Sequence, residues 1–387
     1  MSNRRQFLRF LAGSPLVAAA GQENPAVLSS PKEALNVMDF EAAARKALPP
    51  AHYGYLATGV DDDATLRANR EGFQRFQLHP RRVVDVSGLP DVSTDLFGTK
   101  WETPIWLAPV GSQNAFYPEG EVVAARAAAK KKTLQILSTN TTCPIEKVVE
   151  AAGRPIWYQL YATPRFENTE KLVKHAERAG CPVLVMTVDL PVGRNTETQE
   201  RFRRTDTRKC EACHTPGQGF SHKFMYQGID MKGLSTSQPA MTWDFVRRVK
   251  NLSSMKLVLK GIETGEDARL CCENGVDGII VSNHGGRAEE SGRGTIECLP
   301  EVVKAVGDRI PVMIDSGFRR GTDILKALAL GAKAVGIGRP YIWGMAAFGQ
   351  PGVERVLDIL RWELELVMRQ CGARTLGQIT QSMVVTR

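Results

Sequence analysis

The sequence predicts an α/β protein, a closed (β/α)8 TIM barrel preceded by a helical segment. Two observations predict it. Short apolar runs alternate eight times with helical patterns, and glycine and polar residues gather where the apolar runs end. An open doubly wound sheet is the alternative. Against it, no Gly-x-Gly-x-x-Gly follows the first strand and opens a helix, so a dinucleotide fold is not indicated.

Residues 1–20 resemble a twin-arginine export signal. Arg4 and Arg5 precede a weak apolar run, and three alanines end the segment before Gly21. This predicts an exported, periplasmic protein. The alternative is a basic amphipathic end, which would leave the protein in the cytoplasm. No run of 18 apolar residues is present, so no membrane-spanning helix is predicted.

Residues 21–100 form the predicted helical segment, interrupted at Pro49 and Pro50 and resumed at 53–59. Residues 101–387 form the predicted barrel. Its expected strands cover residues 105–109, 135–138, 156–161, 183–189, 257–260, 278–283, 312–315 and 334–338, with helices between them at, for example, 121–132, 169–178, 266–273 and 322–330.

The connection after the fourth strand, residues 190–242, is far longer than loops in such units need to be. It has little periodicity and is a candidate lid over the barrel mouth. A disordered insertion is the alternative.

Chemistry is expected around His284 and Arg287, which leave the carboxyl end of a buried strand on either side of a Gly-Gly turn. A base beside a guanidinium suits removal of a proton from a small molecule whose carboxylate the arginine binds at two points. A capped structural turn is the alternative. The formal charge of +8 is spread out once the arginines of the signal segment are set aside, which favours a small anionic ligand over nucleic acid.

Other polar residues also fall at strand ends. After the seventh and eighth strands, the loops 315–321 and 336–340 combine glycines with Arg319 and Arg339. Barrels often bind phosphate with these two loops, so a phosphate-bearing ligand is predicted.

These motifs resemble the FMN-dependent α-hydroxy-acid oxidases and dehydrogenases, the family of glycolate oxidase, lactate oxidase, mandelate dehydrogenase and the lactate-oxidising flavocytochrome. The resemblance covers about residues 36–379. It is carried by Ser-Asn-His-Gly-Gly-Arg at 282–287, Leu-Lys-Gly at 259–261 with Glu-Asp-Ala at 266–268, Arg-Arg-Gly-Thr-Asp at 319–323, Lys-Ala-Leu-Ala-Leu-Gly-Ala at 326–332 and Ile-Gly-Arg-Pro at 337–340.

The resemblance implies a role for each residue. His284 would be the catalytic base, Asp189 would hold its ring and stabilise the imidazolium, and Tyr161 would bond the substrate oxygen. Arg287, assisted by Tyr55, would bind the substrate carboxylate. The residues expected to bind FMN are Pro109, Val110, Gly111, Ser138, Gln159, Thr187, Lys260, Ser282, Asp315, Ser316, Gly317, Arg319, Gly338 and Arg339.

Three departures from the family pattern qualify these roles. Asn195 stands where the family usually has a second substrate-binding arginine, a role that Arg194 or a lid residue would have to take. Asn140 stands where glycolate oxidase has a tryptophan, which implies a different or roomier pocket. Residues 288–290 read Ala-Glu-Glu in place of Gln-Leu-Asp.

Within the long connection, Cys210, Cys213 and His214 have the spacing of a covalent haem c attachment site. A zinc site that also uses His222, and a local disulfide, are the alternatives. A haem would need a sixth ligand, for which His222, Met225 and Met231 are candidates. The other six cysteines are expected to be core residues.

We therefore expect FMN-dependent oxidation of an L-2-hydroxy acid to the 2-oxo acid, with electrons passing to haem, quinone, cytochrome or oxygen, in a homo-oligomer. The alternatives are an FMN barrel that acts on a phosphorylated or larger substrate, and an exported flavin or electron carrier without catalysis.

Overall fold

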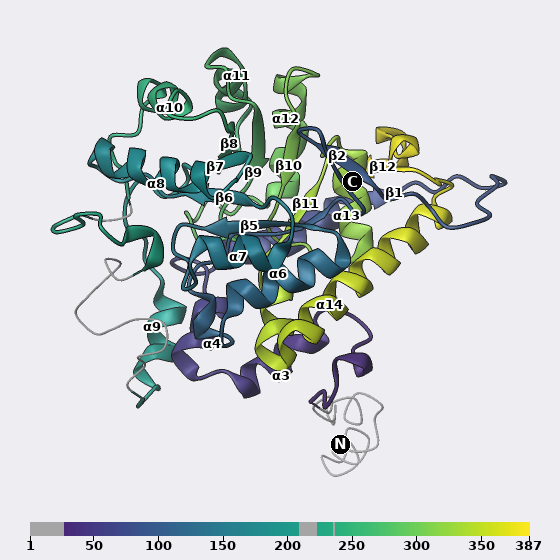
Figure 1. Ribbon diagram of the computed structural model, residues 1–387. Coiled ribbons are helices and arrows are strands. Elements are labelled where there is room, and N and C mark those ends of the chain that lie inside the picture. The colour runs from purple at the N-terminus through teal and green to yellow at the C-terminus, as the bar shows by residue number, and fades with distance from the viewer. Residues whose placement is uncertain (1–26, 209–222, 235–236) are drawn as a thin grey trace, which may run out of the picture.

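The protein is described by a computed structural model, which covers residues 27–208, 223–234 and 237–387 (Figure 1). The predicted export signal, the Cys210, Cys213, His214 motif and the candidate ligand His222 lie outside these residues.

Eight parallel strands form a closed barrel, as predicted. Its order is β10-β11-β4-β5-β6-β7-β8-β9, and β9 pairs with β10 to complete the circle. The strands are β4 (Ile105–Leu107), β5 (Leu134–Ser138), β6 (Trp157–Leu160), β7 (Val183–Thr187), β8 (Lys256–Lys260), β9 (Gly278–Val281), β10 (Val312–Ile314) and β11 (Val335–Ile337). Each overlaps a strand expected from the sequence.

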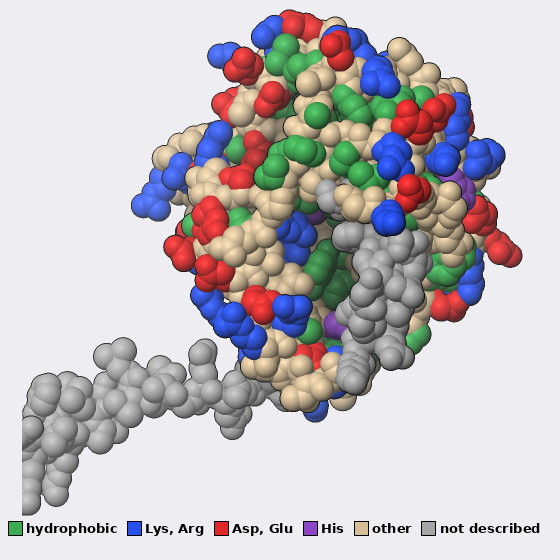
Figure 2. Space-filling view, turned by 90° about the vertical axis from the view of Figure 1, so that its left-hand side faces the viewer, with side chains coloured by type: hydrophobic (Ala, Val, Ile, Leu, Met, Phe, Trp, Pro, Cys, Tyr) green, Lys and Arg blue, Asp and Glu red, His purple; other side chains and the backbone are tan. Residues whose placement is uncertain are grey.

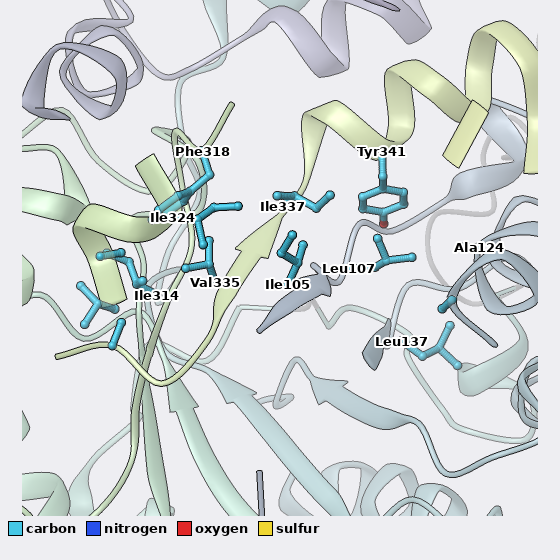
Figure 3. Close-up of a cluster of buried hydrophobic side chains, with 14 of the residues drawn as sticks. Ile105, Leu107, Ala124, Leu137, Ile314, Phe318, Ile324, Val335, Ile337 and Tyr341 are labelled. Atoms are coloured by element: carbon cyan, nitrogen blue, oxygen red, sulfur yellow. The ribbon is translucent and has the colours of Figure 1, made fainter. Parts of the chain in front are cut away.

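Alternate residues of a barrel strand face opposite sides, and β4 is an example. Ile105 and Leu107 pack outward with the helices, whereas Trp106 packs inside the barrel. Figure 3 shows Ile105 and Leu107 beside Val335, Ile337 and other buried side chains of this layer. The interior is filled with side chains and is closed at the amino-terminal end by the hairpin of β2 (Thr94–Leu96) and β3 (Thr99–Trp101).

Helices surround the strands (Figure 1). They are α6 (Gly120–Lys131), α7 (Ile145–Ala152), α8 (Phe166–Arg178), α10 (Trp243–Lys250), α11 (Gly265–Glu273), α12 (Thr295–Val306), α13 (Gly321–Ala329) and α14 (Arg339–Gln370). The last one bends at Gly349, whose φ of 60° is left-handed. None of the described helices is long and apolar enough to cross a membrane.

The amino-terminal segment is helical, as expected, with η1 (Pro31–Glu33), α3 (Asp39–Ala47), α4 (Pro50–Ala57), α5 (Ala64–Glu71) and η2 (Gly72–Arg75). It is fastened to the end of the chain, because β1 (Phe76–Leu78) pairs with β12 (Val384–Thr386). Two short 3-10 turns, η5 (Leu376–Gln378) and η6 (Gln381–Met383), precede β12, and η3 (Gln113–Ala115) follows β4.

The long connection differs from expectation, because part of it is regular. It contains α9 (Glu197–Arg204) and η4 (Phe224–Tyr226). The sequence of α9 is mostly charged and contains one large apolar residue, Phe202. Its ring packs edge-on against the ring of Tyr53 in α4, with centroids 5.4 Å apart. This contact depends on tertiary structure, so no local pattern reveals it.

Candidate functional site

A sharp turn presents His284 at the carboxyl end of β9. Its backbone is left-handed (φ 59°), and Gly285 and Gly286 follow with φ of 71° and 74°. Only glycine fits at Gly286, since a Cβ there would lie 2.5 Å from the backbone nitrogen of Leu66 in α5. The turn therefore packs against the amino-terminal helices, and His284 lines a cavity at the barrel mouth.

His284 lies between a carboxylate and a phenol. Its Nδ1 donates a hydrogen bond to Oδ1 of Asp189 (2.9 Å), so Nε2 is the unprotonated nitrogen and accepts one from the Tyr161 hydroxyl (3.2 Å). Burial lowers the pKa of His284 to about 4; nearby Asp189 opposes this shift, and the charges of Lys260 and Arg194 add to it. His284 is therefore a neutral base at neutral pH.

Lys260, at the end of β8, supplies a buried positive charge. Its Nζ donates to Oγ of Ser282 (2.8 Å) and lies 3.6 Å and 3.7 Å from the carboxylates of Asp189 and Asp315. Burial acts to lower the pKa of Lys260, but the two carboxylates outweigh it and raise the pKa. Burial acts to raise the pKa of Asp189, but His284 and Lys260 hold it low. Both groups are therefore charged at neutral pH.

Arg287 presents one open edge. Its Nη1 donates to the carbonyls of Tyr55 and Thr58, and its guanidinium carbon lies 4.2 Å from the centroid of the Tyr55 ring. Its Nε and Nη2 are buried and have no hydrogen-bond partner among the described residues. Burial lowers its pKa to about 9, so the group stays charged at neutral pH. Two parallel N–H groups on one edge are what a carboxylate accepts in two-point fashion.

A second arginine approaches the same place. Arg194 donates from Nη1 to the backbone carbonyl of Arg287 (3.2 Å), and its charge acts on His284 and Tyr161. Asn195 turns outward instead, donating to Asp61 (2.9 Å) and Glu197 (3.2 Å). The charge missing at position 195 is therefore present one residue earlier.

Three polar side chains connect the ends of β5, β6 and β7. The Ser138 hydroxyl donates to Oε1 of Gln159 (3.0 Å), and Nε2 of Gln159 donates to the Thr187 hydroxyl (2.9 Å). All three side chains are buried. This ladder forms one wall of the barrel mouth. Gly111 lies next to it, since a Cβ there would lie 3.5 Å from Oγ of Ser138.

One cavity, open to solvent at the barrel mouth, brings most of the predicted residues together. Its lining includes Tyr55, Pro109, Val110, Lys260, His284, Arg287, Asp315, Ser316, Gly317, Arg319, Gly338 and Arg339. Figure 2 shows a hollow in the molecular surface with basic, hydrophobic and histidine side chains inside it. Gly111, Ser138, Gln159, Thr187 and Ser282 lie at neighbouring strand ends, and Tyr161 and Asp189 contact His284.

The part of the cavity after β10 and β11 is basic. Arg319 stacks over the Trp343 ring at 4.6 Å, and burial lowers its pKa to about 10. Arg339 donates to the carbonyls of Thr58 (2.8 Å) and Gly285 (2.8 Å), which ties the end of β11 to the His284 turn. Gly317 is left-handed (φ 85°), and a Cβ there would overlap the Asn69 carbonyl.

These residues fit a flavin mononucleotide. The molecule has a ring whose reduced form is negative at one end and a phosphate at the other. Lys260 offers a buried cation for the ring, while Arg319, Arg339 and the glycine backbone at 317 and 338 suit the phosphate.

The sequence did not single out Lys223 and Tyr226, although both are buried beside the loops after β4 and β5. They follow an aperiodic stretch, so no local signal marks them. Met225 and Met231, candidates for a sixth haem ligand, are buried apolar side chains within the core cluster.

The fold and the site define a class of protein: a (β/α)8 barrel whose mouth holds a neutral histidine and an arginine with an open edge in one cavity that fits a flavin cofactor. The family model described as FMN-dependent dehydrogenase matches residues 44–386. The chain belongs to this family.

Individual proteins and solved structures are also similar to this chain. A peroxisomal (S)-2-hydroxy-acid oxidase of Oryza sativa is 40% identical over 352 residues, which cover 91% of this chain and 96% of that protein. An L-lactate dehydrogenase (cytochrome) of Wickerhamomyces anomalus is 35% identical over 91% of this chain and 62% of its own. A soluble mutant of the membrane-associated (S)-mandelate dehydrogenase from Pseudomonas putida superposes with a TM-score of 0.83 at 33% identity, covering 91% of this chain and 99% of that one. The protein is an FMN-dependent 2-hydroxy-acid oxidoreductase.

Proposed function

We propose that the protein oxidises an (S)-2-hydroxy acid to the 2-oxo acid with His284 as the base. The observation that carries the proposal is the open edge of Arg287, which lines the same cavity as His284. A substrate carboxylate on that edge brings the neighbouring carbon and its hydroxyl towards Nε2 of His284. When bound, FMN supplies the two-electron acceptor.

Each neighbour of His284 has a role in this proposal. Nε2 takes a proton from the substrate, and Asp189, ionised and 2.9 Å from Nδ1, stabilises the imidazolium that results. The Tyr161 hydroxyl lies 3.2 Å from Nε2, where it can hold the substrate oxygen. Burial raises the pKa of Tyr161, so the phenol remains a hydrogen-bond donor at neutral pH.

We assign the second carboxylate contact to Arg194. Its charge acts on Arg287, His284 and Tyr161, whereas Asn195 is engaged elsewhere. This argues against a carrier protein without catalysis, since both the base and the carboxylate site are assembled. A phosphorylated substrate is the second candidate; the placement of the His284 base in the same cavity as the open edge of Arg287 favours a free carboxylate next to the reacting carbon.

The test is anaerobic mixing of the purified holoenzyme with paired (S)- and (R)-2-hydroxy acids, monitored by flavin absorbance. Bleaching by an (S) acid and not by its mirror image is expected. His284→Gln should keep its FMN and slow bleaching by roughly 10²- to 10⁴-fold, the usual contribution of a general base. His79→Gln is the matched control, because His79 is exposed and remote in the fold. A flavin that no hydroxy acid bleaches would refute the proposal.

The electron acceptor and location are proposed separately. We propose export by the twin-arginine route and transfer of electrons to a quinone, a cytochrome, oxygen or a haem c at Cys210, Cys213 and His214. A haem absorption band in protein made with the maturation machinery, lost in Cys213→Ala with FMN content unchanged, would support the haem. Absence of that band in the parent protein would exclude it. Fusing residues 1–30 to a reporter active only after twin-arginine export tests the location.

We also propose a homo-oligomer. Trp362 and Leu366 lie one turn apart on α14 and are 60% and 39% exposed. Exposed apolar side chains that cluster on one helix face are typical of subunit contacts.

A further inference from the structure

Helix α5 lies directly against the turn that presents His284. A Cβ on Gly286 would lie 2.5 Å from the backbone nitrogen of Leu66, and one on Gly294, just before α12, would lie 2.6 Å from the Ala68 carbonyl oxygen. Only glycine allows so close an approach to a helix backbone. The helix belongs to the amino-terminal segment, so its influence on the site passes through this contact.

The turn itself needs outside support. His284, Gly285 and Gly286 are left-handed in succession, and a residue other than glycine keeps this conformation only where its surroundings hold it. Asn283 supplies part of that support. Its Oδ1 accepts from the backbone nitrogen of Gly286 (2.9 Å), and its carbonyl accepts from the backbone nitrogens of Gly286 (3.0 Å) and Arg287 (3.1 Å). The orientation of one side-chain amide therefore helps to keep His284 in place.

Asn69 of α5 fixes that orientation. Its Nδ2 donates to Oδ1 of Asn283 (2.9 Å), and Nδ2 of Asn283 donates back to Oδ1 of Asn69 (2.9 Å). The Thr295 backbone nitrogen also donates to Oδ1 of Asn69 (3.2 Å), and Nδ2 of Asn283 donates to the Arg293 carbonyl (3.1 Å). The two asparagines are 2% and 0% exposed. Turning either amide over would set oxygen against oxygen and N–H against N–H, so one orientation alone satisfies these partners.

We propose that Asn69 is a positioning residue for the oxidation, which acts through Asn283 to hold His284 at the reacting carbon. This inference rests on the proposed oxidation at His284. In it, Asn69 contacts neither the substrate nor FMN.

Arg287 leaves the same turn but has a second anchorage. Its Nη1 donates to the carbonyls of Tyr55 (2.5 Å) and Thr58 (3.1 Å) in the amino-terminal segment. Loss of the Asn69 side chain should therefore misplace His284 more than it weakens binding of the substrate carboxylate. The expected signature is a lower rate with little change in KM.

The test is Asn69→Leu, which keeps the approximate size of the side chain and removes both hydrogen bonds to Asn283. The holoenzyme is mixed anaerobically with an (S)-2-hydroxy acid that bleaches the parent protein. The rate constant of flavin reduction at saturating substrate should fall roughly 10- to 100-fold, because a displacement of about 1 Å in a reacting group can cost that much. The substrate concentration that gives half of this rate should change less than about threefold.

Thr65→Val is the matched control. Thr65 is fully buried on the same helix, and its hydroxyl accepts from the backbone nitrogen of Gly292 (2.9 Å), outside the His284 turn. The variant loses one buried hydrogen bond and should be less stable, yet it should reduce its flavin at the parent rate. Thermal melting and flavin content measure the folding of each variant.

Two further variants make the test sharper. Asn69→Asp keeps the shape and polarity of the side chain but sets an oxygen against Oδ1 of Asn283, so it should slow reduction as Asn69→Leu does. Asn69→Leu combined with Asn283→Leu should be no slower than the slower of the two single variants, because both remove the same pair of hydrogen bonds.

The outcomes separate the two proposals. If no 2-hydroxy acid bleaches the parent protein, the proposed function fails and this inference fails with it. If the parent is bleached and the Asn69 variants are as fast as Thr65→Val, oxidation stands and the positioning role is refuted. It is also refuted if the effects of the two leucine substitutions multiply, or if KM rises more than the rate falls. If neither Asn69 variant folds, the pair serves the fold itself, and the assignment is overturned.

Discussion

His284 owes its neutral state to its surroundings. Burial disfavours its charged form, and the cations Lys260 and Arg194 act in the same direction, whereas Asp189 alone favours the proton. The base is thus ready before substrate arrives: Asp189 fixes the tautomer of the resting ring and stabilises the imidazolium once the ring gains a proton. Because the positive charge on the ring appears only during the reaction, the attraction of Asp189 is expected to be stronger in the transition state than in the resting enzyme.

The pH profile follows from this pKa of about 4. His284 must be unprotonated to act as a base, so activity is lost as the pH falls through its pKa. The rate of flavin reduction at low substrate concentration should stay constant from pH 7 to about 5 and fall roughly tenfold per unit below about 4. Stopped-flow mixing in anaerobic buffers measures it, provided the FMN stays bound. A half-maximal point near the ordinary histidine pKa of about 6.5 would contradict the burial argument.

Arg194 and Asn195 provide a direct comparison of two neighbouring side chains. Arg194→Met should raise KM for the hydroxy acid roughly tenfold or more, because a charge-assisted contact is lost. Asn195→Met removes only contacts to Asp61 and Glu197 outside the cavity and should change KM less than about twofold. Steady-state kinetics with one substrate measures both. Equal effects would mean that Arg194 supports the loop and does not bind substrate.

At the scale of elements, hydrogen bonds between side chains link the ends of neighbouring strands. The ladder of Ser138, Gln159 and Thr187 joins three consecutive strands through one glutamine side chain that donates to one neighbour and accepts from the other. Because each strand end is buried, a broken link leaves hydroxyl groups without partners, which costs about 1–3 kcal/mol per group. The ladder therefore fixes the wall on which the flavin ring is proposed to lie.

Gln159→Leu tests this wall. It should lower the free energy of unfolding by about 1–3 kcal/mol and weaken FMN binding roughly tenfold, since both hydrogen bonds are lost at the cofactor. Flavin fluorescence during titration of the apoprotein measures the affinity, and denaturant unfolding of the apoprotein measures the stability. Gln381→Leu at an exposed position is the control. A loss of stability with unchanged FMN affinity would make the ladder purely structural.

Elements also show what the sequence could predict. Buried parallel strands are continuous apolar runs, so β7 and β9 were recognisable from local sequence alone. The residues at their ends, including His284 and Asp189, followed from the rule that the carboxyl ends of barrel strands carry chemistry. The helix α9 and the contact of Lys223 with Ser112 were not predictable, because they depend on segments about 150 and 110 residues apart meeting in space.

At the scale of the whole molecule, one region reaches beyond the barrel. Residues 79–93, between β1 and β2, extend from the body at the right of Figure 1. They are tied to the end of α14, where Arg82 donates to the Gln370 carbonyl (2.7 Å) and Arg369 donates to the Val86 carbonyl (3.1 Å). Val83 is fully exposed on this extension, and Leu89 is 84% exposed. A segment that is anchored in this way and carries two exposed apolar side chains is suited to contact a second copy of the chain.

Trp362→Asp tests whether the exposed face of α14 holds the subunits together. A charge at this position would have to be buried without a partner in a subunit interface, so the variant should dissociate to smaller species while its isolated barrel remains folded. Light scattering after size-exclusion chromatography measures the mass, and circular dichroism measures the fold. Leu35→Asp is the matched control, because Leu35 is also an exposed apolar residue (83%) but lies in the amino-terminal segment. If the parent protein is a monomer, or if Trp362→Asp keeps the parent mass, the exposed tryptophan has another role. Dissociation with intact flavin reduction would in turn show that each barrel carries a complete site, as the cavity lined by one chain's own residues predicts.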